Sequence, residues 1–115
     1  MSRYSRLPLS ASTDWRGIQI VELGTPGDLI HTPSGSINII DEVYLWAENL
    51  HTAKVLITVE FGGINIQDLM MTSIPTVTGL QIVQGRPMND TLEIRVHADV
   101  ANVINIWGYI NRIEL

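Results

Sequence analysis

The sequence contains no cysteine, which excludes disulfide bonds, thiolate metal sites and thiol nucleophiles. Small extracellular domains often depend on disulfide bonds, so their absence favours an intracellular origin. No apolar run approaches the roughly 20 residues that a membrane-spanning helix needs. The first residues also lack the uninterrupted apolar stretch of a signal peptide. We therefore expect a soluble protein with no membrane partner.

Charge is also scarce. Charged residues make up 17% of the chain, whereas an ordinary domain has about 25%. We expect part of the surface to be uncharged and covered by a protein partner. The net charge is −5, and residues 1–16 hold three arginines against one aspartate, so the rest of the chain carries the acidic excess. An acidic body repels phosphate backbones, and nucleic acid is therefore not expected as a partner.

The chain has three histidines, and none has the spacing of a metal site. His31, His51 and His97 lie on different segments, without the close spacing that gathers metal ligands from one segment. The sequence also lacks the Gly-x-Ser-x-Gly pattern of a serine hydrolase. We interpret the histidines as isolated surface residues, and we expect no metal and no cofactor.

Paired carboxylates are the remaining route to catalysis. Asp41 and Glu42 are adjacent in the chain, and adjacent residues of a strand point to opposite faces, so they cannot act as one acid–base pair. We expect Asp41, Glu60 and Glu93 to be solvated on polar faces. The sequence thus predicts that the protein is not an enzyme.

Side chains alternate between apolar and polar almost throughout, which indicates strands with one buried face. The clearest cases are Glu42–Glu48, Lys54–Phe61, Thr91–Ala98 and Val103–Ile113. Gly108 lies in the apolar row of the last one, where it suggests a bulge or a close approach by another backbone. Weaker candidates are Gly17–Glu22, Asp28–His31, Ser36–Ile39, Leu69–Ile74 and Leu80–Gln84.

The fold class follows from short strands separated by Gly- and Pro-containing turns. A chain of 115 residues makes one domain, and about eight strands favour a jelly-roll-like β-sandwich. An immunoglobulin-like topology competes, although its Cys…Trp…Cys signature is absent. We expect an all-β sandwich over residues 17–115, preceded by an extended N-terminal arm over residues 1–16.

Four aromatic residues lie opposite the most apolar rows of two predicted strands, namely Tyr44, Trp46, Trp107 and Tyr109. Three interpretations stay open for them: packing within the same chain, an interface between subunits, or a platform on which sugar rings stack. Aromatic residues often anchor protein interfaces, and the low charge supports contact with protein.

Four segments in order resemble small virion structural proteins of tailed bacteriophages, the kind that decorate or cement the capsid. They are Asp41–Asn49, Leu56–Gly63, Gly79–Gly85 and Ala101–Ile113, and the resemblance covers residues 37–113. It implies a β-rich protein without catalysis that is located in the virion capsid and assembled in the host cytoplasm. It also implies binding to the major capsid protein as a homo-oligomer, with a trimer favoured.

Our own hypothesis for the contacts combines the basic N-terminal arm with the exposed aromatics. The candidate interface residues are Arg3, Tyr4, Arg6, Trp15, Trp46, Trp107 and Tyr109. An alternative function is a carbohydrate- or receptor-binding β-sandwich module of a phage tail or fibre. In that case Trp46 or Trp107 would stack against a sugar ring.

Overall fold

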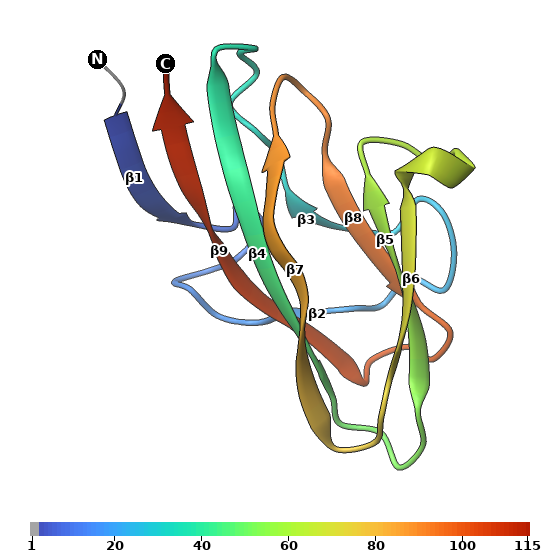
Figure 1. The fold of residues 1–115 in the computed structure, drawn as a ribbon. Helices are drawn as coiled ribbons and strands as arrows, with labels where there is room; N and C mark the ends of the chain where they lie inside the picture. Colours follow the sequence, from blue (N-terminus) through green and yellow to red (C-terminus); the bar gives the residue numbers. More distant parts are fainter. Residues whose placement is uncertain (1–2) are drawn as a thin grey trace.

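The protein is a sandwich of two antiparallel sheets (Figure 1), seen in a computed structural model that describes residues 3–115. The first sheet has the order β1–β9–β4–β7, with β2 also paired to β9, and the second has the order β3–β8–β5–β6. The strands of the first sheet are β1 (Arg3–Pro8), β2 (Ile18–Gln19), β4 (Ile39–Asn49), β7 (Thr78–Met88) and β9 (Ile104–Glu114). Those of the second are β3 (Asp28–His31), β5 (Val55–Phe61), β6 (Leu69–Ile74) and β8 (Ile94–Ala98), with one short 3-10 turn, η1 (Ile66–Asp68), before β6.

The strand pairs are nested along the chain. The innermost pair is β5–β6, followed outward by β4–β7, β3–β8 and finally β1–β9. These four nested pairs are the pattern of one long hairpin rolled into two stacked sheets, which is a jelly roll; the short β2 is an addition to the first sheet. The predicted all-β, jelly-roll-like sandwich is therefore confirmed.

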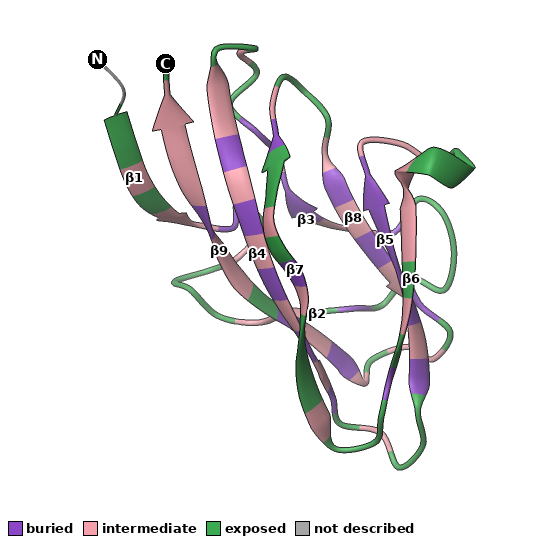
Figure 2. Cartoon of the chain, viewed as in Figure 1, coloured by how far each residue is buried: buried purple, intermediate pink, exposed green. Residues whose placement is uncertain are grey.

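The core lies between the two sheets and follows the predicted alternation (Figure 2). In β4, the inward side chains Val43, Leu45 and Ala47 are fully buried. In β8, Ile94 and Val96 are buried in the same way. Each such aliphatic side chain contributes about 1.5–3 kcal/mol by leaving water, so this layer is the main source of stability.

Gly108 of β9 lies directly opposite Leu45 of β4. A Cβ atom added there would overlap the carbonyl oxygen of Tyr44, far inside van der Waals contact. The predicted close approach of two backbones is confirmed, and any side chain at this position would force the two strands apart.

The N-terminal segment is part of the sandwich rather than an arm that precedes it. Arg3–Pro8 form β1, paired along its length with β9, and Leu9 is buried in the core. The predicted arm over residues 1–16 is corrected accordingly; Met1 and Ser2 lie outside the described residues. β1 escaped detection because an edge strand with Arg3 and Arg6 has no apolar row.

β7 also runs further than the sequence pattern indicates. The prediction ended this strand at Gln84, yet β7 continues to Met88. Gly85 has a φ of 72° next to a shift of register against β4, so the glycine forms a bulge instead of ending the strand. Among residues 3–115, no helix has the length and apolar character to cross a membrane.

Candidate functional site

The outer face of the first sheet carries an aromatic cluster. Tyr44 of β4 lies directly opposite Tyr109 of β9, and their rings stack with centroids 5.0 Å apart and planes 19° apart. Trp46 lies next along β4, with its ring 5.9 Å from that of Tyr109. The stacking covers one face of each tyrosine ring. Such pairs contribute about 0.5–1.5 kcal/mol beyond burial.

β1 joins this cluster through Arg6. Its guanidinium carbon lies 4.3 Å from the centroid of the Tyr109 ring, a cation–π contact that contributes about 0.5–1 kcal/mol at a surface. Tyr4 is on the same face of β1, two residues earlier, and is 71% exposed. The edge strand therefore extends the aromatic face with one cation and one exposed ring.

Trp107 extends the cluster towards β2. It lies opposite Trp46 in the register of β9 and β4 and is 42% exposed. A Cβ atom on Gly17 would lie 2.8 Å from the Trp107 ring, so the ring rests on the backbone of Gly17. A hollow of about 310 Å³ beside the ring is lined by Arg16, Gly17, Gln19, Asn105 and Trp107.

Trp15 stands on a strained turn beside this hollow. Asp14 and Trp15 have φ values of 53° and 66°, and the Arg16 N–H donates a 3.0 Å hydrogen bond to the Thr13 carbonyl. Two successive positive φ values are the mark of a type I′ turn, which ordinarily contains Asn-Gly. A large L side chain in this conformation costs about 1–2 kcal/mol, yet Trp15 is 51% exposed.

The structure brings five of the predicted interface residues onto one face, namely Tyr4, Arg6, Trp46, Trp107 and Tyr109. Trp15 directly precedes Arg16 and Gly17, which line the hollow beside Trp107. Arg3 does not join them: it points to the other face of β1, where its Nε is 3.6 Å from Glu114 Oε2. Tyr44 was missing from the predicted interface residues, although its place in the alternation pointed to the same face.

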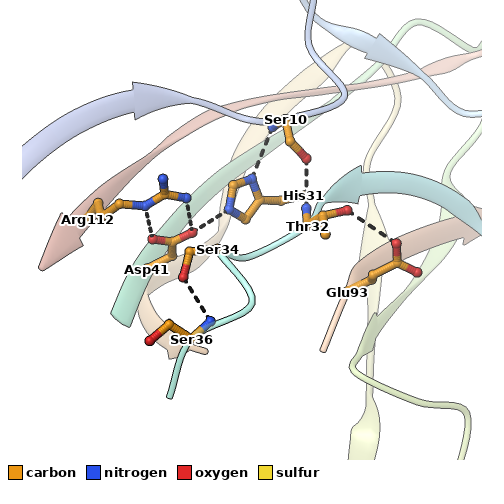
Figure 3. A network of polar contacts seen from close by, with 8 residues as sticks. All are labelled: Ser10, His31, Thr32, Ser34, Ser36, Asp41, Glu93 and Arg112. Atoms are coloured by element: carbon orange, nitrogen blue, oxygen red, sulfur yellow. Dashed lines mark hydrogen bonds and ion pairs between the residues drawn. The ribbon is translucent and has the colours of Figure 1, made fainter. Parts of the chain in front are cut away.

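A buried polar network ties the edge of the sandwich together (Figure 3). Asp41, fully buried, accepts hydrogen bonds from Arg112 Nε at 2.8 Å and Nη2 at 3.0 Å. Its Oδ2 also lies 2.7 Å from His31 Nε2. The Ser10 backbone N–H donates to His31 Nδ1 at 3.0 Å. Nδ1 is thus an acceptor, so the proton sits on Nε2 and His31 is neutral.

The charge balance of this network sets the pKa of Asp41. Burial alone would raise the pKa of that carboxyl, but hydrogen bonds from Arg112 and His31 and the charge of Arg112 outweigh burial and hold the pKa below 3.8. The same ion pair raises the pKa of Arg112. The predicted surface location of His31 and the predicted solvated location of Asp41 are therefore wrong, because the two side chains are buried in the sandwich and hydrogen-bond to each other.

A second buried carboxylate lies under the loop between β2 and β3. Glu60 Oε2 accepts from the Gly27 N–H at 3.0 Å and lies 2.8 Å from His97 Nδ1. Since a carboxylate only accepts, His97 donates here. Glu60 is 2% exposed, so its predicted solvated position is also wrong. The Arg95 Nη1 donates to the Gly27 carbonyl at 3.1 Å, which fixes the loop on the sheet.

These polar groups serve the fold. Across residues 3–115, no three His, Asp or Glu side chains gather as a metal site would require. A hollow of about 640 Å³ is lined by the loop Val21–Leu29 together with Arg95. Arg95 already donates to Gly27 and Glu93. Asp28 Oδ2 accepts from the backbone N–H groups of Val21 and Glu22 at 2.7 and 2.9 Å, so these two polar side chains hold the loop in place. The aromatic face is the strongest candidate for function, and its side chains are suited to binding another molecule through aromatic and cation–π contacts.

Comparison with known proteins found no matching family model, curated sequence or solved structure.

Proposed function

We propose that the protein is a bacteriophage virion structural protein that binds the capsid shell as a cement or decoration subunit. The observation that carries the proposal is the aromatic face of the first sheet, where Tyr4 and Trp107 stay exposed beside Arg6. Trp, Tyr and Arg are the residue types that most often anchor protein interfaces. The resemblance of residues 37–113 to small virion structural proteins supplies the partner, the major capsid protein.

The proposed work is thermodynamic. A subunit that contacts two neighbouring capsid proteins binds only the assembled shell, so its binding free energy adds to the stability of the shell. When the free concentration of the protein is 100 times its dissociation constant, binding would contribute about 2.7 kcal/mol per site. Such a function needs a rigid scaffold and an exposed contact surface, and it needs no catalytic residue.

The turn at Trp15 supports this assignment. A tryptophan that is both strained and half exposed costs stability in the free subunit without a compensating burial. A contact made by the indole in the assembled shell would offset that cost. Replacing Trp15 with glycine therefore distinguishes the free subunit from the bound one. The free subunit should become more stable because glycine suits the turn, whereas binding to the shell should weaken because the indole ring is lost.

Capsids that lack the protein provide the test. Adding the wild-type protein is expected to raise the temperature at which these capsids burst, whereas Trp15→Gly and Trp107→Ala should bind about tenfold or more weakly. Leu50→Ala, which truncates an exposed side chain in the loop after β4, is the matched control and should behave as wild type. Capsids that neither bind the wild-type protein nor change their burst temperature would refute the proposal.

A glycan-binding function is the second candidate, and the hollow beside Trp107 favours it. One indole ring there is accompanied by the amides of Gln19 and Asn105, which is suitable chemistry for a sugar ring. The stacked Tyr44 and Tyr109 each have one ring face covered by the other ring. Binding on a glycan array that Trp107→Ala abolishes without unfolding the protein would favour this candidate over capsid binding.

A further inference from the structure

The two open sides of the sandwich differ in how they are protected. On the side formed by β1 and β3, the segment after β1 bridges the sheets. The Ala11 N–H donates to the Ile30 carbonyl at 3.2 Å, and the Thr32 N–H donates to Ser10 Oγ at 2.7 Å. β1 itself carries two arginines and ends at a proline. Short, charged or proline-containing edges resist pairing with other chains.

The opposite side, formed by β6 and β7, has a single charged residue, Arg86, which together with Pro87 lies near the end of β7. The run from Leu69 to Gly85, which includes all of β6 and most of β7, contains no charged residue. Both strands lie at the end of their sheets. Within the described residues β7 pairs with β4 alone, so one row of its backbone N–H and C=O groups faces outward. Long uncharged edges of this kind favour the addition of another strand.

Apolar side chains are exposed along the same side. Met71 of β6 is 62% exposed and Leu80 of β7 is 37% exposed. Between the two strands, Val77 is 77% exposed with a φ of 50°. A β-branched residue is an outlier in this left-handed region, and exposure to water provides no packing that would offset the strain. Backbone strain kept at an exposed apolar residue points to a role outside the isolated chain.

We propose that β7 pairs antiparallel with β7 of a second copy, so that the first sheet continues through both subunits. Each copy carries a net charge of −5, which opposes association through surfaces that share this acidity. The uncharged edge is the part of the sheet that two copies can bring together without like charges facing each other. An antiparallel pair of identical strands has two-fold symmetry and closes as a dimer.

This arrangement has a geometric consequence for the aromatic face. The two-fold axis of an antiparallel strand pair is perpendicular to the sheet, so the outer faces of both first sheets point the same way. The dimer therefore presents two copies of the cluster around Tyr44 and Tyr109 on one surface. Such a bivalent surface binds a repeating partner more tightly than either copy alone. The dimer itself forms without the partner, and its test is independent of capsid binding.

The mass of the purified full chain, measured by light scattering over a dilution series, tests the proposal. The wild type should have the mass of two chains. Gly79→Lys adds a charge to β7 at a glycine whose Cβ would meet only the Ala47 carbonyl, at 3.9 Å, and should weaken the dimer about tenfold or more. Gly24→Lys, at a glycine with open space around it in the loop before β3, is the matched control and should leave the dimer intact.

Val77→Asn tests the backbone strain at residue 77 separately from the apolar contact that its side chain would make in the dimer. Asparagine tolerates the left-handed region, so the variant is expected to fold with a melting temperature at or above that of the wild type when both are dilute. Its dimer should nevertheless dissociate more readily. Hydrogen exchange provides the location: β7 amides of the wild type should gain protection as concentration rises. A wild-type monomer at every concentration, an oligomer that leaves β7 amides unprotected, or dimers of Gly79→Lys and Val77→Asn as stable as that of the wild type would each overturn the proposal.

Discussion

Replacing Asp41 with asparagine should remove a large share of the stability of the fold. The carboxylate accepts three hydrogen bonds, two from Arg112 and one from His31. Asparagine has one acceptor oxygen. Its NH₂ group would face an N–H of Arg112 in either orientation, and in one of them it would also face the Nε2–H of His31. The other tautomer of His31 does not help, because its Nδ1–H would face the N–H of Ser10.

The expected cost follows from burial. Asp41 is fully buried, and the side chain of its charged partner Arg112 is 24% exposed. Breaking a buried ion pair by removing one charge costs about 3–5 kcal/mol. Domains are stable by about 5–15 kcal/mol, so the substitution should remove about a fifth of the total or more. A loss of 3 kcal/mol lowers the urea midpoint by about 1.5 M at an ordinary slope.

Urea unfolding followed by tryptophan fluorescence is the assay. Asp14→Asn is the matched control, because it removes the same charge at an exposed position whose φ of 53° suits asparagine. A midpoint for Asp41→Asn within experimental error of the wild type, or an equal loss in the control, would refute the network as a source of stability.

Two further predictions concern the same sheet. The pKa of Asp41 is lower in the folded state than its ordinary value of 3.8, so the stability that this group contributes is present above pH 3.8 and is lost as the pH falls through the lower folded pKa. The urea midpoints of the wild type and of Asp41→Asn should therefore converge on acidification. A constant difference between them down to the lowest pH would contradict this. Gly108→Ala should prevent folding or lower the melting temperature sharply because its Cβ would overlap the Tyr44 carbonyl, whereas Gly79→Ala should fold normally; circular dichroism of both variants decides the matter.

Alternation of side chains was enough to predict the architecture, because burial of one face requires it. β3 and β6 begin and end where the pattern placed them. The rule that neighbours point to opposite faces also correctly separated Asp41, which is buried, from Glu42, which is not. These are local properties of a strand, and a sequence displays them directly.

The misjudged residues depend on partners that are distant in sequence. Asp41 looks like a surface acid until Arg112 of the last strand is placed beside it. His31 looks isolated because Ser10 and Asp41 reach it from different strands or loops. For the candidate site, alternation correctly grouped Trp46 with Tyr109. It could not reveal that Trp15 stands on a strained turn, since that is a property of backbone torsion.

The nesting of the strand pairs also bears on the order in which the protein folds. β5 and β6 are joined by a short connection, so their pairing closes a small loop at little entropic cost. β1 and β9 stand at opposite ends of the chain, and their pairing closes the largest loop of all. Folds dominated by such distant pairings form slowly, in about milliseconds to seconds. We expect the hairpin at the centre of the chain to form first, and the N-terminal strand to be the last to dock and the first to detach.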